Sequence, residues 1–159
     1  MEVKFTPWRM QYIAGPKPDG CVFCAAAASQ DDAATYVVAR GQRCFAILNT
    51  FPYNNGHLMV VPYAHIADVT SLAAEVADEL WAMVRTAIAV LREAMHPDGF
   101  NVGMNLGRTA GAGIADHLHM HVVPRWGGDN NFMSVVSGTR LIPQSLEETW
   151  RVLREAWTD

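Results

Sequence analysis

The stretch from His117 to Val123 limits the fold of this chain more than any other, because histidine alternates there with an aliphatic residue three times. Side chains of a β-strand point alternately to its two faces, and residues two apart lie roughly 6.6 Å apart along it. A helix would turn each ring about 200° from the one before. The pattern therefore predicts a strand with three imidazoles on one face and three aliphatic side chains on the other. The two sets are His117, His119 and His121, and Leu118, Met120 and Val122.

The length and composition of the chain fit one ordinary globular domain of 159 residues. Half of the residues are apolar and 18% are charged, and the net charge of -4 argues against general binding to nucleic acids or acidic membranes. The N-terminus lacks the apolar segment of a signal peptide, and no apolar run has the roughly 18 residues of a membrane span. Three cysteines do not indicate a disulfide framework. We therefore expect a reduced, cytoplasmic protein.

Periodicity and turn signals predict the other elements. Residues 1–20, which are rich in proline and glycine, are expected to form an arm without regular structure. An amphipathic helix of about 25 residues, capped by Ser71 and ending at Met95, is expected to pack on a sheet, and Ser145 is predicted to cap a final helix. The strands are expected at 36–39, 44–48, 57–62, 100–105 and 117–123, the last ended by Pro124. This order predicts an α+β fold, an antiparallel meander backed by the long helix.

A glycine-rich loop from Gly107 to Gly113 leads directly into the histidine strand. Small residues let the backbone approach a ligand closely, and successive N–H groups can form an anion-binding concavity. Because an imidazole attacks phosphorus at neutral pH and leaves again easily, loop and histidines together indicate covalent phosphoryl or nucleotidyl transfer. The same imidazoles would also suit a three-histidine zinc site. The loop favours transfer over the metal site.

These residues resemble the histidine triad (HIT) superfamily. The resemblance rests on Asn105, on the loop ending Ala110-Gly111-Ala112-Gly113, and on His117-x-His119-x-His121-Val122-Val123-Pro124-Arg125. It extends upstream to Asn49 and through Asn55 to Pro62, and it covers about residues 21–126. The stretch from Pro124 to Phe132 resembles the bacterial branch that includes diadenosine tetraphosphate phosphorylases. The resemblance implies a five-stranded HIT-like sheet with one long helix packed on it, continued across a homodimer, with 127–159 as a C-terminal extension.

The resemblance also implies roles for single residues. His119 matches the nucleophile that attacks the α-phosphate and forms a nucleotidyl-histidine intermediate, and His121 matches the proton donor to the leaving phosphate. His57 matches a histidine behind the triad, or else is an ordinary buried histidine. The implied nucleotide contacts are Asn49 at the ribose and, at the phosphates, Asn105 and the backbone of Gly111, Ala112, Gly113 and Ile114. Trp126 either stacks on a base, closes the rim of the site, or has an ordinary packing role.

The loop departs from the family pattern at Gly113 and Ile114, where many members carry Gln and then Ser or Thr. Side-chain hydrogen bonds to phosphate are then missing, so the backbone amides of the loop must hold the phosphate alone. The span from Asn105 to His117 is also a residue longer than in the nucleoside phosphoramidate hydrolases. Both features favour the dinucleoside polyphosphate branch.

Cys21 and Cys24 form a Cys-x-x-Cys pair, which alone is a weak signal of a metal or redox site. Members of the superfamily with such a pair bind structural zinc with two histidines, one after the strand that ends at Pro62 and the other the first of the triad. The ligand set implied here is Cys21, Cys24, His65 and His117, a closed tetrahedral site. Cys44 is expected in the core and His96 on the surface at a helix end.

The implied activity is cleavage of diadenosine tetraphosphate, or of a related dinucleoside polyphosphate, through His119, with phosphate or water resolving the intermediate. No organic cofactor is expected. Two alternatives stay open: an adenosine phosphoramidate hydrolase, and a nucleotide-binding regulatory module with little turnover. Binding alone needs no nucleophile at position 119, which argues against the module.

Overall fold

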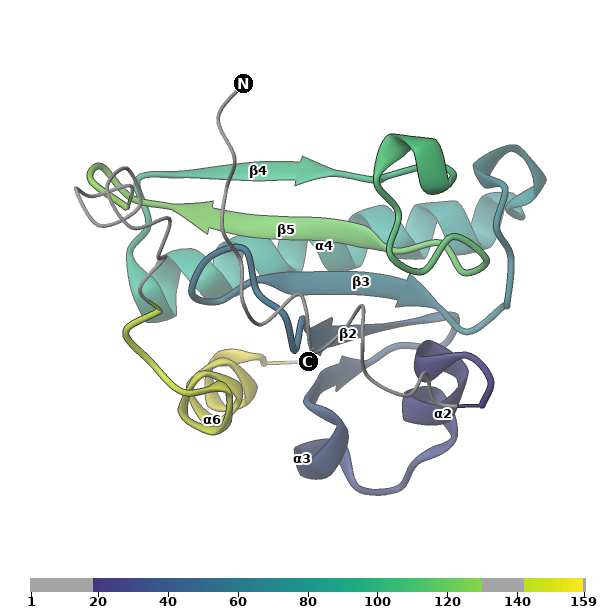
Figure 1. Cartoon of the computed structure of the whole chain (residues 1–159). Helices are drawn as coiled ribbons and strands as arrows, with labels where there is room; N and C mark the ends of the chain where they lie inside the picture. Colours follow the sequence, from purple (N-terminus) through teal and green to yellow (C-terminus); the bar gives the residue numbers. More distant parts are fainter. Residues whose placement is uncertain (1–18, 130–141, 159) are drawn as a thin grey trace.

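The computed structural model of the protein describes residues 19–129 and 142–158. The expected arm over 1–20 falls almost wholly outside the described residues. Within them, five strands form one antiparallel sheet in the order β1-β2-β3-β5-β4 (Figure 1). The strands are β1 (Val37–Arg40), β2 (Cys44–Leu48), β3 (Leu58–Pro62), β4 (Gly99–Gly103) and β5 (Met120–Arg125). The expected α+β class is confirmed.

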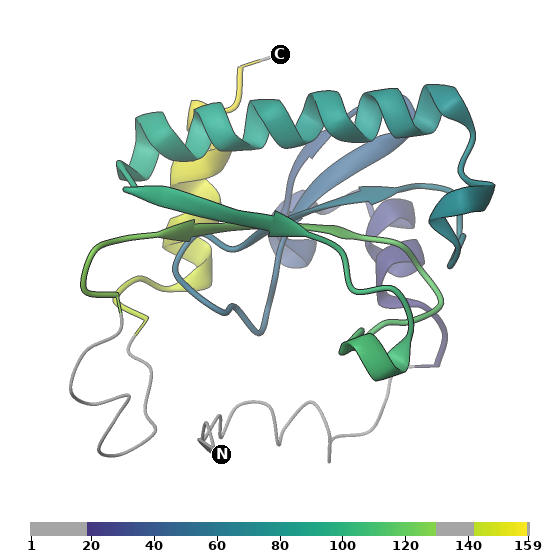
Figure 2. The ribbon, with the colours of Figure 1, turned by 90° about the horizontal axis from the view of Figure 1, so that it is seen from above.

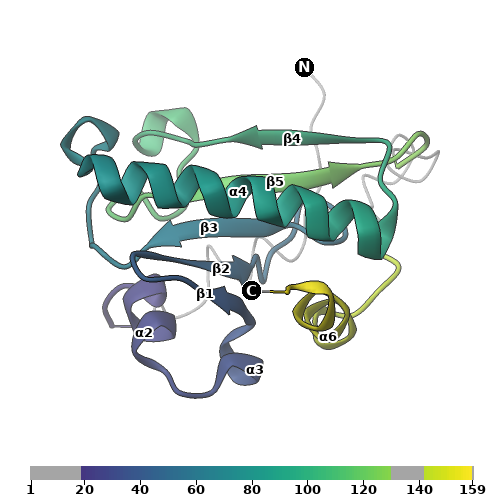
Figure 3. The ribbon, with the colours of Figure 1, turned by 180° about the vertical axis from the view of Figure 1, so that it is seen from behind.

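One long helix, α4 (Ala74–Met95), runs across one face of the sheet, as Figures 2 and 3 show. Its buried side chains recur at helical spacing between Leu80 and Leu91, so one apolar side of the helix faces the strands. Near opposite ends of the sheet lie α2 (Val22–Ala28) and α6 (Leu146–Ala156), and α3 (Asp32–Thr35) leads into β1 (Figure 1). Among the described residues, no helix combines the length and apolar character that crossing a bilayer requires.

Apolar side chains cover both faces of the sheet, and β2 and β3 are buried along their whole length. The cluster on the α4 face includes Leu48, Val60, Val84, Leu91 and Leu153, the last contributed by α6. The cluster on the other face includes Phe23, Phe45, Ile47, Met59 and Val61, the first contributed by α2. Cys44 lies in the first cluster without exposed surface, which confirms its expected place in the core.

The start of α4 differs from expectation, because Ser71 is not its cap. Ser71 ends a separate 3-10 turn, η1 (Val69–Ser71), and the long helix begins after Ala73. The carboxylate of Asp68 accepts from the backbone N–H of Thr70 at 2.9 Å and also from its hydroxyl, so the chain first closes a tight turn. The other end and the final helix are as expected. His96 is exposed just after α4, and Ser145 caps α6 by accepting from the N–H of Glu148 at 3.2 Å.

The expected meander is wrong at one point, because β5 lies between β3 and β4. Only β1, β2 and β3 follow one another as neighbours. The chain leaves β3, crosses the sheet in α4 and enters β4 at the far edge, and β5 then returns as an antiparallel partner of both β3 and β4. The strand that carries the third histidine therefore lies inside the sheet.

The bounds of β5 also differ from the expected 117–123. Ladder pairing begins at Met120, so His117 and His119 precede the strand. Its neighbour β3 ends at Pro62, whose carbonyl accepts from the His117 ring at 2.8 Å instead of from a strand backbone. At the other end, β5 continues through Pro124 to Arg125. The β3 ladder has stopped by then and only β4 is still paired, so a residue without an N–H is tolerated.

Candidate active site and metal cluster

The three predicted imidazoles lie in a row on the sheet face opposite α4. The ring centroids of His119 and His121 are 4.8 Å apart, and the ring of Phe23 lies 5.4 Å from His117 and 5.0 Å from His119. His121 pairs with Met59, which belongs to the same apolar cluster as Phe23. All three histidines are buried. The row therefore combines titratable rings with a dry, aromatic surrounding.

The backbone holds His119 in a nucleophilic tautomer. Its Nδ1 lies 2.9 Å from the carbonyl oxygen of His117, and a carbonyl can only accept, so Nδ1 carries the proton. In the neutral ring the lone pair is then on Nε2. Burial lowers the pKa of His119, partly offset by this bond, which keeps the lone pair available near neutral pH. The ring is thus prepared to attack an electrophile through Nε2.

A relay of two hydrogen bonds determines the tautomer of His121. The backbone N–H of Tyr53 donates to Nδ1 of His57 at 3.0 Å, so the proton of His57 is on Nε2. That Nε2 lies 2.8 Å from Nδ1 of His121 and donates to it. His121 must then carry its own proton on Nε2. Among the side-chain nitrogen and oxygen atoms of the described residues, this Nε2 alone is both buried and without a hydrogen-bond partner.

The same surroundings keep both relay histidines uncharged. Burial lowers the pKa of His57 to about 3, with a further contribution from the neighbouring imidazoles of His121 and His119. Burial likewise lowers the pKa of His121 to about 4. While both rings are neutral, each accepts a hydrogen bond on Nδ1 and carries on Nε2 a proton that it can donate. A ring protonated on both nitrogens could no longer accept, so the series of hydrogen bonds would be interrupted.

Stability is expected to fall with acidification because of these two rings. In the unfolded chain their pKa values return to about 6.5, so between pH 6.5 and about 4 the unfolded chain binds protons that the folded protein excludes. The contribution is complete above pH 6.5 and decreases below it, by about 1–3 kcal/mol per pH unit for the pair. Urea unfolding at pH 7.5, 6 and 5 measures this slope. A His57→Gln variant should show a shallower slope, and equal slopes in both proteins would contradict the assignment.

The four residues of the expected metal site lie together in the structure. Sγ of Cys21 and Sγ of Cys24 lie 3.3 and 3.6 Å from Nδ1 of His117, and Sγ of Cys24 lies 3.3 Å from Nδ1 of His65. All four ligand atoms are within 4.8 Å of one another. Ligand atoms around a tetrahedral zinc are about 3.3–3.8 Å apart, given bonds of 2.0–2.3 Å. Because His117 donates its Nε2 proton to Pro62, its Nδ1 lone pair is free for a metal ion, and the four residues fit such an ion.

An arginine on β1 positions the helix that carries half of this cluster. The guanidinium of Arg40 donates to the carbonyl oxygens of Ala26 and Ala27 in the last turn of α2 and of Ser29, which follows the helix, at 2.9–3.1 Å, so it binds carbonyls at the C-terminal end of α2. It also pairs with Asp32. These bonds fix α2 against the sheet edge, and with it both Cys24 and Phe23.

The glycine-rich loop closes over the histidine face. It contains a 3-10 turn, η2 (Arg108–Ala110), flanked by Gly107 and Gly111 with φ of 85° and 94°, which glycine adopts without strain. The side-chain amide of Asn105 lies 3.5 Å from the carbonyl oxygen of Gly111. Ala112 is buried, and Ile114 packs against the cluster that contains Phe23. The predicted phosphate-contacting residues are thus held near the row of rings.

The other two predicted nucleotide contacts lie at different distances from the row. Asn49 directly follows β2, and its side chain accepts from the N–H of Phe51 at 2.9 Å; together with His57 it lines a cavity of about 150 Å³. Trp126 follows β5, five residues past His121, or about 16 Å along an extended chain. Its indole N–H donates to the carbonyl of Met95 at 3.3 Å, and it lines a second cavity of about 360 Å³. His119 lines neither cavity, and the structure does not bring Trp126 beside the rings.

Three contributors to the site were missed from the sequence. The N–H of Tyr53 and the carbonyl of Pro62 act through the backbone, so residue type carries no signal of them. Phe23, between the two cysteines, could have been noticed as an aromatic residue at a fixed place in a ligand motif. The helix that carries it was not predicted.

Fold and site together define a small α+β protein with a row of buried histidines and a glycine-rich loop on one sheet face. A model of the HIT domain matches residues 30–128. The chain is 44% identical to the AP-4-A phosphorylase of Mycobacterium tuberculosis, covering 96% of this chain and 83% of that protein. The chain therefore belongs to the HIT family.

Solved structures agree with this assignment. A zinc-bound histidine triad family protein from Mycobacterium smegmatis is 32% identical, with a TM-score of 0.71, over 86% of this chain and 92% of that one. A hypothetical histidine triad nucleotide-binding protein from Sulfolobus tokodaii is 27% identical, with a TM-score of 0.70, over 86% and 91%.

Proposed function

We propose that this protein cleaves diadenosine tetraphosphate by phosphorolysis through a covalent intermediate on His119. The observation that carries the proposal is the hydrogen bond from His119 Nδ1 to the His117 carbonyl, which leaves a lone pair on Nε2. The AP-4-A phosphorylase of Mycobacterium tuberculosis, 44% identical to this chain, supports the substrate and the use of phosphate. Binding alone would not require a ring prepared in this way.

In the first step the Nε2 lone pair of His119 forms a bond to the α-phosphorus of the substrate. The bond from that phosphorus to the bridging oxygen breaks, and the rest of the molecule leaves as ATP. The buried Nε2–H of His121 donates to the bridging oxygen as negative charge develops on it. The carbonyl of His117 stabilises the positive charge that the His119 ring acquires.

In the second step an oxygen of inorganic phosphate attacks the same phosphorus and the nitrogen–phosphorus bond breaks. ADP is released and the lone pair returns to His119. The predicted contacts of the phosphate groups are Asn105 and the backbone amides from Gly111 to Ile114, and Asn49 is the predicted ribose contact. Amides that are already fixed in a loop need no reorganisation when charge develops, which favours the transition state.

We also propose that the cluster of Cys21, Cys24, His65 and His117 holds structural zinc. A site with four protein ligands leaves no open position, so zinc there supplies cross-linking and no Lewis acid chemistry. The zinc-bound relative from Mycobacterium smegmatis supports the identity of the metal. Free cysteines suit a reducing compartment, so we place the protein in the cytoplasm.

The two edges of the sheet support a homodimer formed through β4. At the β1 edge, side chains of α6 occupy backbone acceptors: the Trp150 indole donates to Val37 at 2.8 Å and Arg154 donates to Val38 at 2.9 Å. At the other edge, β4 is exposed from Asn101 to Gly103. An exposed edge strand readily pairs with another strand. We expect a dimer in sedimentation equilibrium at micromolar concentration, and a monomer would contradict this arrangement.

Product analysis tests the proposed reaction directly. The protein is incubated with diadenosine tetraphosphate, with and without inorganic phosphate, and the nucleotides are separated by chromatography. ATP plus ADP, formed only with phosphate, is the expected result. ATP plus AMP without phosphate would show a hydrolase instead. If adenosine phosphoramidate alone is cleaved, or nothing is, the proposed substrate is wrong.

A further inference from the structure

The loop from Asn49 to His57 determines the direction of the relay that ends at His121. It is closed by backbone bonds from the N–H of Asn49 to the carbonyl of His57 at 2.9 Å, and from the N–H of His57 to the carbonyl of Asn54 at 3.3 Å. Within it, the N–H of Tyr53 must point at Nδ1 of His57 for the relay to keep its tautomers. Whatever fixes the loop backbone beside Tyr53 therefore also fixes the donor at His121.

Two successive asparagine side chains anchor the loop directly after Tyr53. The buried amide of Asn54 donates to Asp129 at 2.8 Å and to the carbonyl of Pro124 at 3.1 Å. The amide of Asn55 donates to the side-chain oxygen of Gln144 at 3.1 Å. The anchors thus come from the end of β5 and from the segment that precedes α6.

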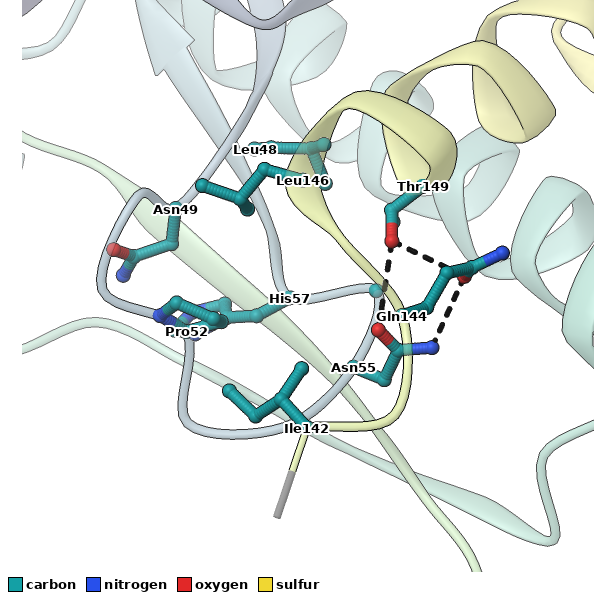
Figure 4. A pocket seen from close by; sticks show the side chains of 10 residues that line it. Leu48, Asn49, Pro52, Asn55, His57, Ile142, Gln144, Leu146 and Thr149 are labelled. Carbon is teal, nitrogen blue, oxygen red and sulfur yellow. Dashed lines mark hydrogen bonds between the residues drawn. The ribbon is translucent and has the colours of Figure 1, made fainter. Parts of the chain in front are cut away.

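Gln144 and Thr149 form a polar contact with Asn55 at the start of α6 (Figure 4). The Thr149 hydroxyl, on a residue only 2% exposed, lies 3.1 Å from the Gln144 oxygen and 3.5 Å from the Asn55 oxygen, and it is also 2.8 Å from the carbonyl of Ser145. The 150 Å³ cavity lies between this contact and the loop, lined by Leu48, Pro52 and His57 among others. Because open space adjoins the loop here, packing leaves it room to move on this side. The polar contact through Asn55 restrains the loop there, in addition to the bonds that Asn54 makes.

We propose that Gln144, supported by Thr149, is a positioning residue that holds the loop through Asn55 and thereby fixes the His57–His121 relay. This inference rests on the proposed function for its catalytic consequence. Asp129, Gln144 and Thr149 all follow the segment matched by the family model, which ends at residue 128. The residues that hold the loop through Asn55 therefore come from the C-terminal extension, whereas the loop and the histidines lie within the matched segment.

The test compares Gln144→Ala with Gln144→Glu, which keeps an acceptor oxygen for Asn55, and with Arg154→Ala as a control. Arg154 lies on the same helix but donates to Val38 on β1, away from the loop. The ring nitrogens of His57 and His121 are followed by ¹⁵N NMR, and kcat and KM are measured with diadenosine tetraphosphate and phosphate. The tautomers and the kinetic constants are also measured on the wild type. An inactive wild type would contradict the proposed function without affecting the tautomer result.

In Gln144→Ala we expect mixed tautomers at His57 and His121 and a kcat lowered about 10-fold, a part of what a positioned proton donor contributes, with KM changed less than about 2-fold. Gln144→Glu should restore both readouts, and Arg154→Ala should leave both unchanged. Unaltered tautomers and kcat in Gln144→Ala would overturn the inference, as would an equal loss in Arg154→Ala. Altered tautomers together with an inactive wild type would support the positioning role and reject the proposed substrate.

Discussion

Replacing His119 by asparagine is expected to lower kcat for diadenosine tetraphosphate at least about 10⁴-fold, because the reaction loses its only route through a covalent intermediate. Asparagine is close in size and polar, so the contact with Phe23 and the bond to the His117 carbonyl can be partly kept. The substrate should still bind, and KM should change far less than kcat. Steady-state kinetics with and without phosphate measure both constants.

Trapping the intermediate makes this expectation sharper. Labelled diadenosine tetraphosphate is added without phosphate, so that phosphate cannot consume the intermediate. The reaction is quenched in base, because acid hydrolyses the phosphorus–nitrogen bond. The wild type should carry label and His119→Asn should carry none. His96→Asn serves as the matched control, because His96 is exposed beyond the end of α4. Label on the asparagine variant, or equal loss in the control, would exclude His119 as the nucleophile.

Short-range patterns were sufficient to predict most of the fold. Short continuous apolar runs bounded by turn signals gave β2 and β3 nearly to their observed bounds, and the 3.6-residue period gave α4. The position of β5 between β3 and β4 could not be predicted in this way, because it is decided by where a long crossover helix delivers the chain. The short helix α2 was also missed, since its run of alanines after Phe23 has no apolar periodicity to detect.

For the site, the sequence identified the side chains that could react but not the groups that orient them. The alternation of the three imidazoles predicted that they share one face, whereas the grouping of Cys21 and Cys24 with His65 and His117 followed only from the resemblance to the family. The orientation of His119, His57 and His117 depends on two carbonyls and one N–H of the backbone, which every residue type possesses. The role of Gln144 could not be predicted either, because its partner Asn55 is 89 residues away in the chain.

Removing the proposed zinc is expected to have the second large effect, because the cluster that would hold it joins three separate parts of the chain. Cys21 and Cys24 come from the start of α2, His65 from the turn after β3, and His117 from the approach to β5. Replacing both cysteines by serine should abolish bound zinc and lower Tm by about 10–20 °C, equivalent to about 5 kcal/mol for a chain of this size. Metal analysis and thermal unfolding measure the two quantities, and Cys44→Ala, which changes a thiol outside the cluster, should keep its zinc.

Activity should fall with the metal even though the metal takes no part in the chemistry. His117 offers its ring nitrogen to the cluster and its carbonyl oxygen to His119, so the same residue links the proposed zinc site to the proposed nucleophile. Without the metal and the two thiols, the ring of His117 keeps the bond to Pro62 and the contact with Phe23 but loses its link to α2, so its carbonyl is held less firmly toward His119. We expect kcat to drop about 10-fold or more in the double serine variant at a temperature where it is still folded. Full activity in a folded protein without zinc would show that the metal cluster does not affect His119, and would reject this link.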